Sequence, residues 1–319
     1  MVFQQSMKTY PFITEVLQIA TVIILAPIFI GWIRMVKCWL QGRTSAGLFQ
    51  PWKDIVKLFY KEIVLAENAS WIFRFTPYLV FGVSVLAAGI IPIISTDLSL
   101  ALTADAIVLV ALFAMARFFT ALAGMDIGTA FGGMGSSREM IIASLSEPAM
   151  LMVIFTVSLV AQSTSLVQIA QVIGHGPFIL RPSLAFALLA FVLIVIAENG
   201  RVPVDNPATH LELTMIHEAM ILEYSGRHLA LIEWASMMKL FLFASLGIVA
   251  FLPWGIAGGS LSDIPLAFVL LVVKLFIAGI ALVLIETGLA KMRIFRVPDF
   301  LGSAFLFATL GMLSYFILE

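Results

Sequence analysis

Charged residues and cysteine are both scarce in this sequence. Only 12% of the 319 residues are charged, where soluble domains carry roughly 25%. Hydrophobic residues make up 61%, and a water-soluble fold could not bury that much apolar surface. Because lipid can replace water around such side chains, the composition predicts an integral membrane protein.

The single cysteine, Cys38, excludes an internal disulfide and an iron–sulfur cluster ligated by cysteines of this chain alone. The net charge of −1 gives no indication of nucleic-acid binding. We expect no cleavable signal sequence, because the first apolar run is long and lacks a small-residue cleavage site.

Apolar runs of roughly 20 residues have the length that crosses a bilayer. They predict an all-α integral membrane protein, with about eight transmembrane helices in one polytopic domain over residues 1–319. Arg117, Lys274 and Glu286 interrupt two of the runs, so a count one lower or one higher stays open. The runs lie near 12–33, 71–95, 105–123, 147–170, 183–198, 234–255, 264–286 and 298–318.

Basic residues are concentrated in the connections after the first, third, fifth and seventh runs. We count 14 of the 18 Lys and Arg residues there, and only Lys8 and Arg181 on the opposite side. Since short cytoplasmic loops carry the excess of basic residues, these connections are predicted to be cytoplasmic and both termini to face outward. The 14 are Arg34, Lys37, Arg43, Lys53, Lys57, Lys61, Arg74, Arg117, Arg138, Arg201, Arg227, Lys291, Arg293 and Arg296.

The first of these connections, near 34–74, contains an amphipathic segment that begins at Pro51. Ile55 and Leu58 lie on one helical face, and three lysines spaced four residues apart from Lys53 lie on another. This pattern predicts a surface helix. Both a basic helix at the lipid surface and a docking surface for a cytoplasmic partner fit it.

The longest polar loop, from Glu198 to Arg227, joins the fifth and sixth runs. Its spacing predicts a helix from Thr209 to Tyr224, with Ser225 and Gly226 as its C-cap. The pair His217–Glu218 has the first half of a zinc-protease motif, but Ile221 stands where the second histidine belongs, so no metal site is predicted. The loop's carboxylates and histidines are Glu198, Asp205, Glu212, Glu218, Glu223, His210 and His217.

Several ionisable residues fall in or near the predicted spans. Such groups are costly in a bilayer unless they are paired or hydrated, so they indicate a proton or ion path. The alternative is that those at helix ends reach the interface. They are Glu147, Glu198, Glu233, Lys239, Lys274 and Glu286.

A glycine-rich connection is predicted from Gly124 to Glu147. It contains Gly132–Gly133 and then Gly135-Ser-Ser-Arg-Glu139. The glycines permit a tight backbone, but the lysine of a phosphate-binding P-loop is missing, so nucleotide binding is not expected.

Three segments together resemble a known family: residues 47–62, residues 135–139 with Glu147, and residues 198–226. They are similar to the membrane subunit of respiratory complex I that anchors the hydrophilic arm and roofs the quinone chamber. The resemblance covers essentially the whole chain.

The third segment departs from the complex I pattern. Arg201, Pro203, Asp205 and Glu212 match it, whereas Val204 replaces an aromatic residue. Acidic positions of complex I are occupied here by Pro207, Ala208 and His210. Residues 205–218 resemble instead the homologous subunit of membrane-bound group 4 [NiFe] hydrogenases.

This resemblance implies an anchoring and ion-coupling subunit in the plasma membrane of a prokaryote. The [NiFe] centre and iron–sulfur clusters are then expected in hydrophilic large and small subunits, beside antiporter-like membrane subunits. The implied coupling residues are Glu147, Glu198, Asp205, His210, Glu212, His217, Glu218, Glu223, Lys239 and Glu286. The implied docking residues are Gln50, Asp54, Lys57, Lys61, Glu62, Arg138 and Arg201.

Three other functions stay open at this point. A true complex I-type subunit would serve quinone reduction, although the missing acidic residues argue against it. A passive anchor would use its buried charges only for pairing. A stand-alone transporter would act without partner chains.

Overall fold

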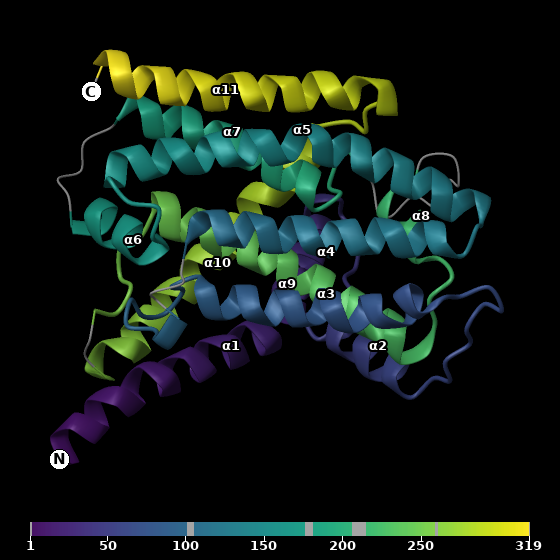
Figure 1. Ribbon diagram of the computed structural model, residues 1–319, viewed down its shortest axis with the longest axis horizontal. Helices are drawn as coiled ribbons and strands as arrows, with labels where there is room; N and C mark the ends of the chain where they lie inside the picture. The colour runs from purple at the N-terminus through teal and green to yellow at the C-terminus, as the bar shows by residue number, and fades with distance from the viewer. Residues whose placement is uncertain (1, 101–104, 176–180, 206–214, 259–260, 319) are drawn as a thin grey trace.

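The computed structural model describes residues 2–100, 105–175, 181–205, 215–258 and 261–318, and its regular elements there are helical. The α-helices, labelled as in Figure 1, are α1 (Val2–Leu40), α2 (Gln50–Phe59), α3 (Trp71–Ile90), α4 (Ala106–Asp126), α5 (Ala130–Ala161), α6 (Leu166–His175), α7 (Pro182–Glu198), α8 (His217–Ile221), α9 (Gly226–Phe251), α10 (Ile264–Gly288) and α11 (Val297–Leu318). Two short 3₁₀ turns, Leu261–Asp263 and Ile294–Arg296, precede α10 and α11.

The long helices confirm a multi-pass membrane architecture. Within the described residues, seven helices are long and apolar enough to cross a membrane: α1, α3, α4, α5, α9, α10 and α11. The shorter apolar helix α7 occupies the position of the predicted fifth span. The exact number of spans therefore stays a prediction.

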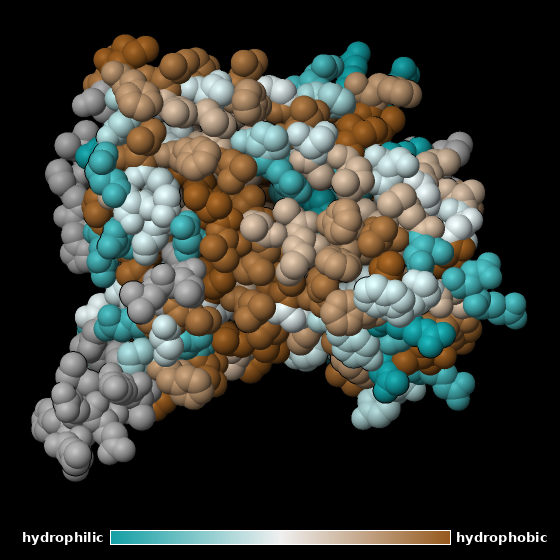
Figure 2. All heavy atoms as spheres, in the orientation of Figure 1, coloured by the Kyte–Doolittle hydropathy of each residue, from teal (hydrophilic) through white to brown (hydrophobic). Residues whose placement is uncertain are grey.

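The bundle has two different ends. Both termini lie at one end, and α2 and α8 lie at the other (Figure 1), which we call the polar end. In Figure 2 hydrophobic side chains dominate the middle of the visible face, and hydrophilic ones lie toward both ends, including the polar end. Exposed apolar residues such as Leu266, Ile277 and Leu284 on α10 suit contact with lipid.

The predicted boundaries of the fourth span are wrong. Helix α5 begins at Ala130, where the hydroxyl of Thr129 accepts a hydrogen bond from the Gly132 N–H, so the connection to α4 is confined to residues 127–129. The helix ends at Ala161 because Gln162 takes a left-handed conformation with φ of 54°. Residues beyond it form the separate helix α6.

The glycines of this segment serve helix packing rather than a loop. A Cβ atom at Gly132 would collide with the carbonyl oxygen of Gly124 on α4, and one at Gly135 would lie 2.9 Å from the carbonyl oxygen of Ile216. The hydroxyl of Ser136 donates to the carbonyl of Ala121 at 2.8 Å. Close contact with α4 and with residues 216–220 thus places a glycine-rich sequence inside a helix.

The predicted helix from Thr209 to Tyr224 is only partly comparable, because residues 206–214 lie outside the described residues. Among those described, the helix is limited to α8, and Met215 and Ile216 are not helical. The predicted C-cap is wrong: Ser225 and Gly226 begin α9 instead. Gly226 has a φ of 53°, and a Cβ atom there would lie 2.7 Å from the carbonyl oxygen of Glu62.

A proline in α1 fixes the surface helix α2. Pro27 has no N–H to bond the carbonyl of Ile23, four residues earlier, and the indole of Trp234 donates to that carbonyl at 3.1 Å. Trp52 of α2 donates to the adjacent carbonyl of Ile24, also at 3.1 Å. The two indole rings meet edge to face at 5.3 Å, so α2 is held against both α1 and α9.

The α4–α5 contact yields a paired prediction. Gly132→Ala should destabilise the protein by about 1–3 kcal/mol, because the new methyl group overpacks the contact with α4. Gly133→Ala is the matched control, since a Cβ atom there would meet nothing within 4 Å. Thermal unfolding in detergent should show a lower midpoint for the first variant alone; equal midpoints would contradict the packing argument.

Candidate functional site

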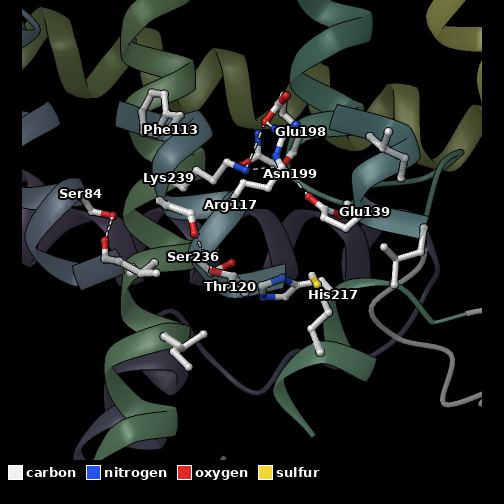
Figure 3. Close-up of a pocket in the computed structure, with 18 of the residues that line it drawn as sticks. Ser84, Phe113, Arg117, Thr120, Glu139, Glu198, Asn199, His217, Ser236 and Lys239 are labelled. Atoms are coloured by element: carbon white, nitrogen blue, oxygen red, sulfur yellow. Dashed lines mark hydrogen bonds and ion pairs between the residues drawn. The ribbon is translucent and has the colours of Figure 1, made fainter. Parts of the chain in front are cut away.

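The candidate site is built around Glu198, the last residue of α7, which is buried. Its carboxylate pairs with Arg117 of α4 and lies 3.3 Å from the Lys239 ammonium of α9. The hydroxyl of Ser146 on α5 donates to it at 2.7 Å. One carboxylate therefore joins four helices, as Figure 3 shows for Arg117, Glu198 and Lys239.

Lys239 has a second bond that depends on where α7 ends. Its ammonium donates to the backbone carbonyl of Glu198 at 2.7 Å. The last carbonyls of a helix lack intrahelical donors, and a cation there also meets the negative end of the helix dipole. Lys239 thus stabilises both the side chain and the backbone at this helix end.

Two further carboxylates on α5 face Arg117. Glu139 lies 3.3 Å from its Nε atom and Glu147 lies 3.6 Å from its Nη1 atom. The cluster therefore holds three carboxylates and two cations. The Arg117 side chain is only 4% exposed, so the cation depends on these partners for its stability.

A cavity of about 80 Å³ adjoins the cluster. Arg117, Glu139, Glu198 and Lys239 line one part of it, and His217 of α8 lines another (Figure 3). Since one water needs about 10–15 Å³, the cavity has room for several. Water there would connect the buried cluster to the loop of the polar end.

A second ion cluster surrounds Glu286, near the end of α10. Its carboxylate, with 1% of the side chain exposed, lies 2.9 Å from the Lys37 ammonium and 3.3 Å from Arg201 Nη1. Burial lowers the pKa of Arg201, and the Glu286 carboxylate opposes that shift. This cluster links α1, α10 and the loop that follows α7.

The described parts of the 199–225 loop are held by further polar contacts. Asp205 lies 3.0 Å from the Lys291 ammonium and accepts a bond from the Ile216 N–H at 3.2 Å. Arg138 of α5 donates to the carbonyl of Met215 at 3.0 Å. These bonds fix both ends of the segment whose middle lies outside the described residues.

The structure brings several of the predicted coupling residues together. Glu147, Glu198 and Lys239 share the first cluster, and His217 reaches it through the cavity. Glu286 and Asp205 lie in neighbouring ion pairs. Half-buried Glu218 follows His217 on α8, and half-buried Glu223 does not line the cavity; His210 and Glu212 lie outside the described residues.

Arg117 is the main residue of the site whose buried position in a helix the sequence does not reveal. Its position groups it with the basic residues of a connection, but it lies inside α4 and is buried. Its carboxylate partner Glu139 is recognisable in the sequence only as part of a motif. A lone arginine in an apolar run indicates either a buried ion pair or a span boundary, and only the fold separates these.

The predicted docking residues divide into two groups. Lys57, Lys61 and Glu62 are exposed, while Gln50 donates to Asp54 at 2.9 Å and Asp54 lies 3.9 Å from Arg34. Arg138 and Arg201 bond within the chain, as described above. Their part in docking stays a prediction.

The long apolar helices define a multi-pass membrane protein with buried ion clusters among its helices. Residues 13–317 match the family model described as NADH dehydrogenase, and the chain belongs to that family.

Three named relatives show which kinds of protein this chain is similar to. The chain is 32% identical over 310 residues to formate hydrogenlyase subunit 4 of Escherichia coli, covering 96% of this chain and 97% of the relative. Identity to hydrogenase-4 component C of the same organism is 31%, covering 89% of each chain. Identity to a subunit of the NADH-quinone oxidoreductase of Syntrophotalea carbinolica is 29%, covering 65% of this chain and 64% of the relative.

A solved structure shares the fold. A chain of the membrane-bound sulfane sulfur reductase, an archaeal respiratory membrane complex, superposes with a TM-score of 0.84 at 21% identity. The match covers 95% of this chain and 99% of the other. Among the described residues, no group of three His, Cys, Asp or Glu side chains is placed to hold a metal ion.

The cluster around Arg117 predicts a non-additive stability pattern. Arg117→Met should destabilise the protein by about 3–5 kcal/mol, because the carboxylates of the cluster lose one of their two cations. Adding Glu198→Gln should restore part of that loss. Thermal unfolding of the single and double variants in detergent tests this, and strictly additive effects would show that the two side chains are not coupled.

Proposed function

We propose that this chain is the membrane anchor and ion-coupling subunit of a group 4 membrane-bound [NiFe] hydrogenase complex. It would link electron transfer in cytoplasmic partner subunits to translocation of protons or sodium ions. Similarity to formate hydrogenlyase subunit 4 along almost the whole chain supports the complex type. The observation that carries the coupling role is the buried cluster at Glu198, joined by a cavity to the loop at His217.

The cluster has the features that ion coupling requires. Its three carboxylates exceed its two cations, so a proton or small cation can be accepted there with a gain in charge balance. Hydration of the cavity would provide a route from the polar end. Glu198 and Lys239 are then the central relay groups, with Glu147 beside them and Glu286 in the neighbouring cluster.

The loop at the polar end is the proposed sensor of the redox centre. Asp205, Glu212, Glu218 and Glu223 would respond to charge changes in the partner above, and His210 and His217 would pass protons near neutral pH. Asp205 and Arg138 anchor the described ends of this loop through Lys291, Ile216 and Met215. Movement or charging of the loop would therefore reach α5 directly.

The proposed partners follow from the same assignment. The [NiFe] centre and iron–sulfur clusters would be carried by hydrophilic large and small subunits, since Cys38 is this chain's only cysteine. Antiporter-like membrane subunits would complete the membrane part. The basic residues of the polar end favour a location on the cytoplasmic side of a prokaryotic plasma membrane.

A complex I-type quinone oxidoreductase is the second candidate. The 29% identity to the NADH-quinone oxidoreductase relative favours it, although that match covers a smaller part of the chain. Quinone-dependent electron transfer by the purified complex, blocked by a quinone-site inhibitor, would support it. Hydrogen production or consumption without added quinone would support the hydrogenase assignment.

The coupling role predicts loss of ion transport when the cluster is neutralised. Glu198→Gln or Lys239→Met in the intact complex should abolish redox-driven ion uptake into vesicles while the subunits still assemble. Glu67→Gln is the matched control, because Glu67 is exposed. If both cluster variants lower thermal stability and transport stays at the wild-type rate, the chain is a passive anchor.

The docking role of α2 predicts a charge-dependent loss of assembly. Lys57→Glu with Lys61→Glu should release the hydrophilic subunits during purification, because both lysines are exposed at the polar end. Arg181→Glu, before α7 at the opposite end, is the control. Normal subunit recovery in the double variant, with weaker binding to anionic lipid, would assign α2 to the lipid surface.

A further inference from the structure

Three cavities follow one another along the same group of helices. The first is the cavity beside Glu198, and the others measure about 10 and 20 Å³. Arg117, Glu198 and Phe113 line both the first and the second cavity. Leu246 lines both the second and the third. Each cavity therefore shares part of its wall with the next.

From the first cavity to the third, the lining residues lie progressively farther from the polar end. On α9 they pass from Lys239 to Leu246 and then to Ala250. On α4, which runs in the opposite direction, they pass from Thr120 through Phe113 to Ala106. On both antiparallel helices, the residues that line successive cavities lie farther from the polar end. The three cavities therefore lie in a row along the bundle axis.

The side chains that line the three cavities change from charged to apolar along the row. The first cavity contains the charged cluster, and the second still touches Arg117, Glu147 and Glu198 on one side. Its other wall is apolar, and every residue that lines the third cavity is apolar: Ala106, Val153, Ile154, Val157, Leu166, Ile169, Phe191, Leu246, Ala250 and Phe251.

Two aromatic rings line the second cavity together with the charged residues. The rings of Phe113 and Phe243 stack with centroids 4.7 Å apart, and both line the second cavity. The Lys239 ammonium lies 5.8 Å from the centre of the Phe243 ring. Leu246 lies one turn further along α9. These three apolar side chains all line the second cavity, which lies between the first and the third.

A carboxylate lies beyond the apolar section. Ala106, which lines the third cavity, is the first residue of α4, and Asp105 is its N-cap. Asp105 is half-buried and accepts a hydrogen bond from the Thr164 hydroxyl at 3.2 Å. Titratable groups thus lie at both ends of the apolar section.

We propose that Phe113, Phe243 and Leu246 form an apolar barrier in an ion pathway that crosses this chain from Glu198 toward Asp105. The proposal rests on the proposed coupling function and gives it an exit on the side opposite the polar end. Small hydrocarbon-lined cavities stay empty of water, and an ion cannot cross a dry apolar constriction until it becomes hydrated. The barrier therefore prevents leakage while the cluster exchanges ions with the polar end.

The test is passive leakage of the intact complex in phosphatidylethanolamine and phosphatidylglycerol vesicles, without electron donor or acceptor. An imposed pH gradient is followed with an entrapped pH-sensitive dye, and an imposed sodium gradient with a sodium-sensitive dye. Leu246→Asn should raise the leak of one ion about tenfold, equal to about 1.4 kcal/mol in barrier height. Leu242→Asn is the matched control, because Leu242 is fully buried on the same helix and lines none of the three cavities.

The outcomes separate barrier, packing and function. A leak in the Leu246 variant alone supports the pathway; equal leaks in both variants, or none in an assembled Leu246 variant, overturn it. If the asparagine variants do not assemble, Leu246→Thr against Leu242→Thr carries the same expectation. Redox-driven transport by the wild-type complex is measured separately, so its absence would refute the coupling function while the leak comparison still decides the barrier.

Discussion

The burial of the Glu198 carboxylate is the constraint on which the rest of the structure depends. An ionised group away from water stays stable only beside opposite charge or hydrogen-bond donors. Here Arg117, Lys239 and Ser146 supply these from α4, α9 and α5. The relative positions of four helices are therefore fixed by one carboxylate, and the cavity lies where their side chains cannot fill the remaining space.

The second ion cluster extends that constraint to the polar end. Only two residues separate Glu198 from Arg201, so the loop leaves the first cluster and enters the second, where Glu286 also pairs with Lys37. Asp205 then bonds Lys291 and the backbone of Ile216. Direct contacts therefore join this loop to α1, α10 and the end of α7 at the Glu198 cluster.

Local patterns predict much of this fold, and long-range pairings are not visible in them. Apolar runs locate the long helices because bilayer thickness sets their length, and lysine spacing locates α2 because amphipathic helices repeat every 3.6 residues. The glycines near Gly132 indicate a loop because their packing value depends on Gly124, which the spacing does not reveal. The sequence pattern assigns Arg117 to a connection for the same reason. Its carboxylate partners lie on helices that come together only when the chain folds.

Stability alone does not explain the Glu198 cluster. Well-packed apolar residues in place of buried ions are often as stable or more so, and a chain this rich in apolar residues has ample means to fill the space. The structure instead keeps three carboxylates against two cations beside an 80 Å³ cavity, and the stacked rings of Phe113 and Phe243 line the next cavity. A polar cavity followed by apolar ones is the arrangement expected where ions exchange on one side and leakage is resisted on the other. Ion coupling uses both properties, whereas a passive anchor requires neither.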